Sequence, residues 1–473
     1  MPEPALVLRG IRKAYPGVVA VDDAHLELYP GEIHALVGEN GAGKSTLSAI
    51  AYGETRADAG TVRASGTVGL VHQHFELVGR LRVWENVLLG REPRRGWRID
   101  EAAARSRVLA VAERNGLAID PNAFVETLPI GVQQRVELLR ELDREPAVLL
   151  LDEPTAALAP AEIASFFATV QGLAARGAAI MIVTHKLQEV IAYATRVSVM
   201  RHGRIVAQME TAATSVDEIA RAMVGGELPS VAARAATQPT PCLSVRALRA
   251  GSGETSVEDI ALDVRAGEIV GIAGVEGNGQ TTLADAIAGM IPYDGTISFA
   301  NEGAQIGVIP QDRHREALVM PWSIVENVML GRQHRPELRR GATLDRAHAR
   351  ADAQRIQERF DVRAATLDVP VRTLSGGNQQ KIVVGRALID DPNVVLAYNP
   401  TRGIDVGAAA LVQSRLMQAR NDGAAVLLIS FELDEILALA DRIAVMYRGR
   451  IVGEFERTNV DRGAIGRLMA GLS

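Results

Sequence analysis

Residues 31–47 read GEIHALVGENGAGKSTL, and residues 267–283 read GEIVGIAGVEGNGQTTL, so one stretch occurs twice in this chain of 473 residues. The first copy contains the pattern G-x-x-x-x-G-K-S/T between an apolar strand at 33–37 and an expected helix. Glycines let backbone N–H groups curve around a phosphate, and the start of a helix favours an anion. The stretch therefore predicts a strand, a phosphate-binding loop and a helix of an α/β fold.

The similarity between the two halves extends well beyond this stretch. Gln280 lies 236 positions after its counterpart Lys44, whereas Tyr398 lies 246 positions after its counterpart Asp152. VWENVLLG and IVENVMLG match between these two blocks, in the same order. Order and spacing both persist, so the sequence predicts an internal duplication, with a net insertion of 10 residues in the second copy.

Each copy predicts a module of one fold class. The order of strand, Gly-rich turn, helix, mixed region, and buried strands alternating with helices indicates α/β with a mainly parallel central sheet. We expect module 1 at residues 1–228, an Ala/Pro/Thr-rich linker at 229–241 and module 2 at 242–473. Segments 99–114 and 344–360 are rich in Ala, Arg and Glu and predict helices of an inserted helical subdomain in each module.

Composition narrows the class of protein. The net charge of −6 and a pI near 5.9 argue against a nucleic-acid-binding surface, which is usually basic. A single cysteine, Cys242, excludes an internal disulfide framework and fits a reducing cytosol. The sequence shows no secretory signal pattern, and its apolar runs are much shorter than the ~20 residues of a membrane helix. We therefore expect any membrane association to come through a partner.

Module 1 carries residue types suited to nucleotide chemistry. We expect Lys44 to reach the β- and γ-phosphates and the Ser45 hydroxyl to hold Mg²⁺. Residues 148–154, VLLLDEP, predict a buried strand that ends in two carboxylates. Asp152 is placed to bind Mg²⁺ through water, and Glu153 to orient or deprotonate the attacking water. The alternative, acids that cap a helix, is disfavoured by the phosphate loop upstream.

Three further residues of module 1 are candidates for the same site. His185 follows a buried strand and is a candidate γ-phosphate contact, with a structural histidine as the alternative. Gln73, in LVHQHFE, is a candidate Mg²⁺ and water sensor, with a surface glutamine as the alternative. Tyr15 is a candidate for stacking on adenine, with a packed core tyrosine as the alternative. The nucleotide-binding residues predicted in this module are Tyr15, Gly38, Glu39, Asn40, Gly41, Ala42, Gly43, Lys44, Ser45, Thr46 and Gln73.

Two motifs of module 2 resemble a known family. Residues 374–380 read LSGGNQQ and residues 401–407 read TRGIDVG, which are similar to the signature and D-loop of ABC transporter ATPases. The resemblance covers nearly the whole chain and is greatest to duplicated importer ATPases for simple sugars and nucleosides, of the ribose/galactose type. Within that group the wording GVEGNGQ and LSGGNQQK is similar to the nucleoside-uptake branch. The resemblance implies two P-loop NTPase modules packed head to tail, with each ATP between one phosphate loop and the other module's signature.

Carried onto this chain, the resemblance implies one complete site and one degenerate site. The complete site joins the residues of module 1 to Ser375, Gly376 and Gly377, whose backbone N–H groups would bind the γ-phosphate. In the other site the replaced positions are Gln280 for the lysine, Tyr398 and Asn399 for the two acids, Phe431 for the histidine, Gly251 for Tyr15, and Pro129 and Ile130 for the signature Ser and Gly. Thr281 and Gln311 are kept, so weak nucleotide binding stays open there. The first D-loop, AALAP, lacks the aspartate that the second keeps as Asp405.

The resemblance implies an ATP-hydrolysing subunit of a bacterial ABC importer, with ATP and Mg²⁺ as cofactors. It implies transmembrane permease subunits as partners, an indirect extracytoplasmic solute-binding protein, no nucleic acid, and a peripheral place on the cytoplasmic face of the membrane. Two alternatives are a soluble twin-cassette ATPase acting on ribosomes and a regulatory nucleotide-binding protein without transport. The first usually has two intact sites and a long charged linker, and this chain has neither.

Arginine-rich stretches occupy matching places in the two copies. They lie at residues 91–98 and 332–340. Either they face a permease or anionic lipid, or they are solvated loops.

Overall fold

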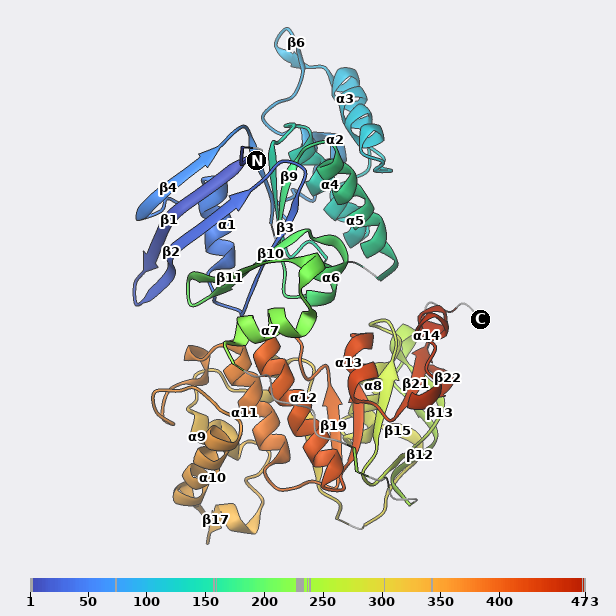
Figure 1. Cartoon of the computed structure of the whole chain (residues 1–473). Helices are drawn as coiled ribbons and strands as arrows, with labels where there is room; N and C mark the ends of the chain where they lie inside the picture. The colour runs from blue at the N-terminus through green and yellow to red at the C-terminus, as the bar shows by residue number, and fades with distance from the viewer. Residues whose placement is uncertain are drawn as a thin grey trace. The chain divides into compact units, whose positions relative to one another are not determined.

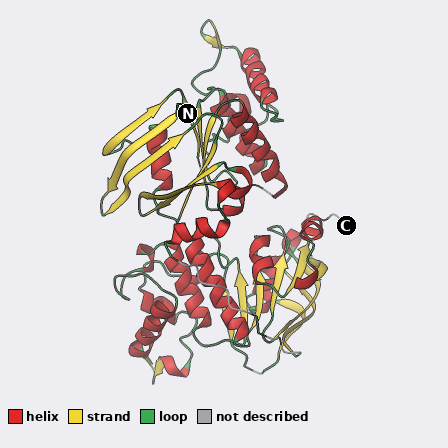
Figure 2. Cartoon of the chain, viewed as in Figure 1, coloured by secondary structure: helices red, strands yellow, loops and turns green. Residues whose placement is uncertain are grey.

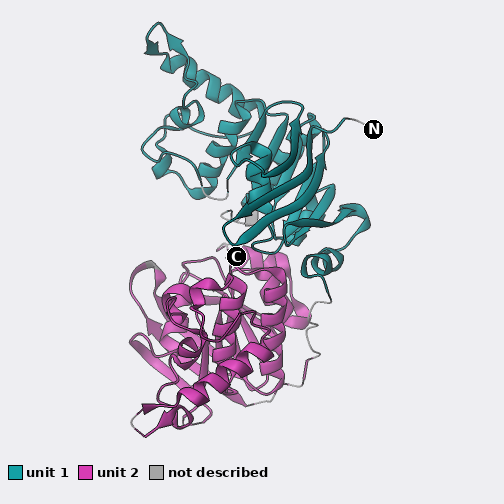
Figure 3. Ribbon diagram, turned by 90° about the vertical axis from the view of Figure 1, so that its left-hand side faces the viewer, with its two compact units in different colours: residues 1–227 teal, residues 228–473 magenta. Residues whose placement is uncertain are grey.

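The computed structural model describes residues 3–469 and 471, except residues 73–74, 156–157, 159, 227–233, 236, 238–239, 302 and 342. It divides into two compact units, residues 1–227 and residues 228–473, which hold module 1 and module 2 (Figure 3). Each unit contains a six-stranded sheet, a three-stranded sheet and helices (Figure 2). The predicted fold class, two α/β modules with mainly parallel sheets, is confirmed. The predicted linker, residues 229–241, falls mostly outside the described residues.

The main sheet of module 1 positions the candidate site. Its strand order is β11-β10-β3-β9-β8-β5, and all neighbours are parallel except the edge strand β11. Its strands are β3 (Ile33–Gly38), β5 (Val68–Val71), β8 (Val148–Asp152), β9 (Ala179–Val183), β10 (Arg196–Arg201) and β11 (Arg204–Glu210). Every residue of β3, β8 and β9 is buried, which explains why these strands are apolar apart from His34 and the terminal Asp152. Because these strands are parallel, their carboxyl ends meet at one edge of the sheet.

A three-stranded antiparallel sheet lies beside the main sheet, with helix α1 (Lys44–Tyr52) between them (Figure 1). Its strands are β1 (Leu6–Tyr15), β2 (Val18–Leu28) and β4 (Ala59–Ala64). Leu47 of α1 belongs to one buried cluster with Leu8 of the small sheet and Leu150 of the main sheet. This packing on two sides holds the helix at whose start the phosphate loop lies.

The helical part of module 1 follows the small sheet in the chain. It consists of α2 (Val83–Val87), the hairpin of β6 (Arg94–Arg95) and β7 (Arg98–Ile99), α3 (Glu101–Arg114), a short 3-10 turn (Val125–Thr127) and α4 (Ile130–Leu142). The predicted helix at 99–114 begins two residues later than expected, because the Asp100 side chain accepts a hydrogen bond from the Ala103 N–H and caps it. The remaining helices are α5 (Pro160–Ala175), α6 (Leu187–Tyr193) and α7 (Val216–Val224).

Module 2 repeats this arrangement. Its main sheet has the order β16-β19-β20-β14-β21-β22 and its small sheet β13-β12-β15. The strands are β12 (Pro241–Ala250), β13 (Val257–Arg265), β14 (Ile269–Ala273), β15 (Tyr293–Phe299), β16 (Ile306–Ile309), β19 (Val394–Tyr398), β20 (Ala425–Ile429), β21 (Arg442–Tyr447) and β22 (Arg450–Glu456). As in module 1, every residue of the central strands β14, β19 and β20 is buried.

The helices of module 2 also match those of module 1. They are α8 (Gln280–Ile287), α9 (Ile324–Met329), α10 (Arg346–Arg359), α11 (Gly376–Leu388), α12 (Val406–Asn421), α13 (Leu433–Leu439) and α14 (Arg462–Met469). The helix predicted at 344–360 begins after Asp345, whose side chain caps it as Asp100 caps α3. Among the described residues, no helix has the length and apolar character needed to cross a membrane.

Candidate functional site

The phosphate loop of module 1 is held by backbone packing. Gly43, with φ of 105°, ends the loop, and no side chain caps the first turn of α1. A Cβ atom on Gly43 would lie 2.1 Å from the Ala20 carbonyl oxygen, and one on Gly38 would lie 2.2 Å from that of Met200. Only glycine fits at these two positions. The first N–H groups of α1 are therefore free of side-chain caps, as a phosphate cradle requires.

Lys44 lies inside the curve of the loop. Its ammonium group donates hydrogen bonds to the carbonyl oxygens of Gly38 at 2.8 Å and Glu39 at 3.0 Å, and only 6% of the residue is exposed. The positive charge is thus held against the loop that is expected to wrap the phosphates. The other predicted loop residues, Asn40, Gly41, Ala42 and Thr46, lie in the same loop or in the first turn of α1.

Asp152 stands at the carboxyl end of β8, close to the start of α1. The Ser45 hydroxyl hydrogen-bonds its carboxyl group, while the Oδ1 atom is buried without a partner among the described residues. Burial raises the pKa of Asp152, and the Ser45 hydrogen bond opposes the rise. A buried carboxylate oxygen that lacks a partner among the described residues, next to the Ser45 hydroxyl, is a donor set that suits Mg²⁺. The residues of module 1 therefore fit the metal that the sequence predicts.

Glu153 and His185 form a direct contact at the same edge of the sheet. His185 Nδ1 lies 3.1 Å from Glu153 Oε1, and this hydrogen bond is the main reason that the pKa of Glu153 is lowered. Glu153 is held in the left-handed region, with φ of 47°, and its N–H donates to the Val183 carbonyl at 2.9 Å. The arrangement presents an ionised carboxylate beside the phosphate loop.

Two other predicted residues of module 1 have different outcomes. Tyr15 ends β1 and is 46% exposed, so the alternative of a packed core tyrosine is wrong. Its ring is free to stack, with the Lys13 ammonium 5.6 Å from the ring centroid. Gln73 lies outside the described residues, as do residues 156–157 and 159 of the first D-loop. The predicted roles of Gln73 and of this loop stay predictions.

The phosphate loop of module 2 keeps its shape but loses its charge. Gly277 and Gly279 have φ of 93° and 99°, close to those of their counterparts in module 1. Gln280 Nε2 donates to the Val275 carbonyl oxygen at 3.0 Å, which matches the contact of Lys44 with Glu39. The Gln280 Oε1 atom is buried and has no partner among the described residues. A neutral amide thus replaces the ammonium group in an otherwise similar loop.

A cluster of side chains fills the metal position of module 2. The Thr281 hydroxyl and the Tyr398 hydroxyl lie 2.8 Å apart, and the Tyr398 ring packs edge-on against Phe431 at 5.9 Å between centroids. Asn399 Oδ1 accepts a hydrogen bond from the Phe431 N–H at 3.0 Å, which ties the cluster together. Burial raises the pKa of Tyr398, so its phenol stays neutral. The neutral Tyr398 phenol hydrogen-bonds the Thr281 hydroxyl, which is the group that would bind a metal. These residues therefore do not fit Mg²⁺.

The two signature segments differ in the way that the sequence predicts. Ser375 caps α11, and its Oγ atom accepts a hydrogen bond from the Asn378 N–H at 3.4 Å. A Cβ atom on Gly377 would lie 3.0 Å from Asp405 Oδ2, so the start of this helix packs closely on the D-loop aspartate of its own module. In module 1, α4 begins after Pro129, which has neither a capping side chain nor an N–H. Only module 2 therefore offers a capping serine and two glycines at this position, whereas module 1 keeps one glycine, Gly131.

One pair of equivalent glutamine contacts was not predicted from the sequence. Gln380 Nε2 of α11 donates to the Pro400 carbonyl oxygen at 2.7 Å, and Gln134 of α4 makes the same bond to Pro154. Each hydrogen bond connects a signature helix to the loop after a strand of the main sheet, which is β19 in module 2 and β8 in module 1. The repeat itself carries the signal, because LPIGVQQ and LSGGNQQ share this glutamine although their serine and first glycine differ.

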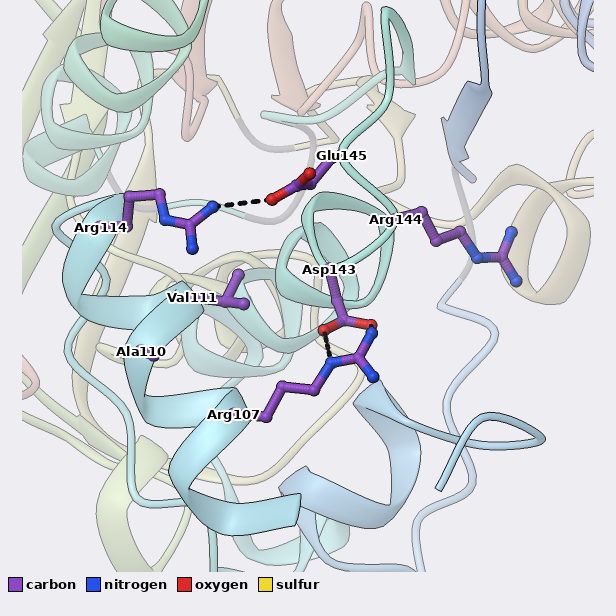
Figure 4. A pocket seen from close by; sticks show the side chains of 7 residues that line it. All are labelled: Arg107, Ala110, Val111, Arg114, Asp143, Arg144 and Glu145. Carbon is purple, nitrogen blue, oxygen red and sulfur yellow. Dashed lines mark hydrogen bonds and ion pairs between the residues drawn. The ribbon is translucent and has the colours of Figure 1, made fainter. Parts of the chain in front are cut away.

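A separate pocket lies in the helical part of module 1. It holds about 350 Å³ and is lined by Arg107, Ala110, Val111, Arg114, Asp143, Arg144 and Glu145. Figure 4 shows Arg107 paired with Asp143 and Arg114 paired with Glu145, at 2.7 Å and 2.9 Å. Its lining residues precede β8, whereas Asp152 ends that strand, so the pocket and the phosphate loop lie at opposite ends of β8. Because its charged side chains already form ion pairs, we do not assign it to the site.

Comparisons with known proteins agree with these features. Residues 21–156 and 257–402 match the ABC transporter family. The chain is 39% identical over 498 residues to the nucleoside import ATP-binding protein NupA of Lactococcus lactis, covering 99% of this chain and 98% of the relative. It is 39% identical over 479 residues to the ribose import ATP-binding protein RbsA 1 of Rubrobacter xylanophilus, covering 95% of each. The archaeal ribosome recycling factor aABCE1, in complex with a stalk protein, shares the fold with a TM-score of 0.69 at 17% identity, over 98% of this chain and 92% of that chain.

Proposed function

This chain belongs to the ABC transporter family, and we propose that it is the ATP-hydrolysing subunit of an importer for nucleosides or simple sugars, with one working ATPase site. It is therefore an ABC-type ATPase with two cassettes. The substrate class rests on relatives that are named as nucleoside and ribose import proteins and that match over nearly their full length. The ribosome recycling factor, at 17% identity, supports the fold alone.

The single observation that carries the proposal of one working site is the contrast between two equivalent corners. In module 1, Glu153 contacts His185, and Asp152 keeps a free carboxylate oxygen beside Ser45. In module 2, Tyr398 closes the same corner by bonding Thr281. Hydrolysis needs an ionised acid and an open metal position, and one corner alone supplies both.

The residues of module 1 divide the chemistry among themselves. We assign to Lys44 the compensation of phosphate charge, and to Glu153 the orientation of water and acceptance of its proton. His185 holds the Glu153 carboxylate in place and keeps it ionised through their hydrogen bond. Ser45 and Asp152 would hold Mg²⁺, which when bound neutralises charge that develops on the phosphate oxygens.

We further assign the signature of module 2 to this site. Ser375, Gly376 and Gly377 would contact the γ-phosphate through N–H groups at the start of α11. Support comes from the degenerate partner segment, in which Pro129 starts α4 without a cap. A site that takes residues from both modules would couple ATP hydrolysis to the closing and opening of the modules.

The names of the import relatives also support a set of partners. We assign transmembrane permease subunits as direct partners and an extracytoplasmic solute-binding protein as an indirect one. The chain would then act as a peripheral protein on the cytoplasmic face of the membrane. The negative net charge gives no support to a nucleic-acid partner.

Matched variants in the two modules test the working site. In the complex with its permease, Glu153→Gln should lower ATP turnover at least 100-fold, whereas Asn399→Ala, at the equivalent position, should keep it within about twofold. Ser375→Arg should likewise abolish turnover, and Pro129→Arg, its counterpart, should not. Steady-state phosphate release measures all four. If Asn399→Ala or Pro129→Arg removed activity while its partner variant kept it, the site would be assigned to the wrong halves.

A further inference from the structure

The hairpin of module 1 exposes a tryptophan at its turn. We call residues 94–99 the hairpin tip: β6 and β7 pair Arg94 with Ile99 and Arg95 with Arg98, and Gly96 has φ of 68° in the turn. Trp97 is 83% exposed, and Ile99 is 47% exposed. Figure 1 shows β6 at the outer end of its unit, beyond α3. A large aromatic side chain is thus exposed at the turn of the hairpin, with little of its surface packed against the module.

Three arginines surround this tryptophan. Arg94, Arg95 and Arg98 are all exposed, and none of them forms an ion pair with a described residue. The Arg98 guanidinium carbon lies 4.7 Å from the centroid of the Trp97 ring. The tip therefore combines an exposed aromatic ring with three positive charges that form no ion pair with a described residue. Arg94 acts at longer range on Glu92, whose pKa is lowered by backbone hydrogen bonds and by the charge of this arginine.

The acids beside the tip make contacts other than ion pairs with the tip arginines. Glu92 accepts a hydrogen bond from the Gly90 N–H at 3.0 Å, and the Asp100 side chain caps α3. Glu101 pairs with Arg105. Glu92 and Asp100 stay negatively charged but form no ion pair with the tip arginines, and residues 94–99 themselves carry a formal charge of +3 in a chain whose net charge is −6.

Module 2 repeats the hairpin in a reduced form. Arg339 and Arg340 are exposed and pair in register with Leu344 and Thr343. Leu344 is 44% exposed, and Asp345 caps the next helix, as Asp100 does in module 1. The position that matches Trp97 is residue 342, an alanine that lies outside the described residues. An exposed Arg-Arg-Gly turn is thus common to both modules, and the tryptophan belongs to module 1 alone.

We infer that the hairpin tip of module 1 binds the anionic headgroups of a lipid bilayer, with the Trp97 ring at the boundary between headgroups and acyl chains. Arginine is attracted to anionic lipid, and tryptophan favours the membrane interface. A protein partner usually buries about 800 Å² on each side, which a six-residue convex turn does not offer. A bilayer needs no such complementary surface. This contact goes beyond the proposed ATPase function, because it places a lipid surface against one named turn.

Vesicle binding by the purified full chain tests this inference. We expect sedimentation with vesicles that contain phosphatidylglycerol and not with phosphatidylcholine vesicles, and binding that weakens as salt is raised. Replacing Arg94, Arg95 and Arg98 together by Gln should weaken binding about 100-fold, at about fivefold per arginine. Trp97→Phe should remove a blue shift of fluorescence that anionic vesicles produce, which marks entry of the Trp97 ring into the interface.

Matched variants separate the hairpin tip from general charge. Arg63, Arg249 and Arg467 are also exposed and without ion pairs among the described residues, so their triple change to Gln alters net charge equally and should leave binding within about twofold. Arg339→Gln with Arg340→Gln should have a smaller effect than the triple change in the tip. ATP turnover without vesicles and thermal melting should stay the same in all of these variants.

Three results would overturn the inference. The first is equal binding to neutral and anionic vesicles. The second is binding that survives the triple change in the tip. The third is a chain that binds no vesicle while Trp97→Ala loses its permease during co-purification, since that would show a protein contact at the tip.

Discussion

One pair of aligned residues gives the two modules different charge chemistry. In module 1, Lys186 lies 3.5 Å from Glu189 on α6, and Glu189 accepts a hydrogen bond from the Thr155 hydroxyl at 2.7 Å. In module 2 the matching carboxylate is Glu435, bonded to Thr401 at 2.8 Å, but the lysine is replaced by Glu432. Burial, together with the charge of Glu432, raises the pKa of Glu435 to about 7.

This raised pKa makes the stability of module 2 depend on pH. The folded state binds the Glu435 proton more tightly than the unfolded state, whose pKa is near 4.5. The contribution is therefore complete below about pH 4.5 and is lost as the pH rises through about 7, and it amounts to about 3 kcal/mol. Glu435→Gln should remove this part of the slope. Urea unfolding between pH 5 and 8 measures it, with Trp322 as the reporter after Trp84 and Trp97 are changed to Phe.

Glu189→Gln supplies the control for this pH effect. Its carboxylate has a lysine partner, so its change should leave the slope of the module 2 transition as it is. An unchanged slope in Glu435→Gln would show that another group carries the pH dependence.

At the scale of elements, strands and loops could be predicted, and contacts between side chains could not. The runs that form β3, β8 and β9 are apolar apart from His34 and Asp152 because both faces of each strand are covered, and such runs are visible in sequence. The substitutions in module 2 are also visible in the sequence, but only as the loss of the lysine, the two acids and the histidine. The contacts of Tyr398 with Thr281 and Phe431 depend on two strand ends meeting the start of α8, which no local pattern shows.

The tie between α11 and the Pro400 loop is an element-scale contact with a functional consequence. Gln380→Glu keeps the shape of the side chain but turns an acceptor toward the Pro400 carbonyl oxygen. We expect kcat for ATP to fall about tenfold because the signature helix loses its support, at about 1.4 kcal/mol. Binding of Mg·ATP to the phosphate loop of module 1 should change less than twofold.

A charge control is available on a neighbouring helix. Gln354→Glu, exposed on α10, adds the same negative charge without touching the Pro400 loop and should leave kcat unaltered. A Gln380→Glu variant with normal kcat and weaker nucleotide binding would contradict a positioning role for this glutamine.

At the scale of the whole molecule, the two copies of the module keep different residues of the proposed ATPase site. Module 1 keeps the charged corner of Lys44, Asp152 and Glu153, while module 2 keeps the serine and glycines at the start of α11. The equivalent corner of module 2 is filled by other side chains, because Tyr398 and Phe431 form a packed aromatic pair there. Packing of that kind stabilises the fold of module 2 and at the same time removes the donor set for a metal.

This division predicts the number of nucleotides that one chain binds with Mg²⁺. Titration calorimetry with a non-hydrolysable ATP analogue should give one Mg²⁺-dependent site per chain, and Lys44→Ala should abolish it. In that background, restoring Lys, Asp, Glu and His at Gln280, Tyr398, Asn399 and Phe431 should create a new Mg²⁺-dependent site, because the phosphate loop of module 2 retains its backbone shape. The same titrations in EDTA serve as the control. Two Mg²⁺-dependent sites in the unaltered chain would show that the Tyr398 hydroxyl does not exclude the metal from module 2.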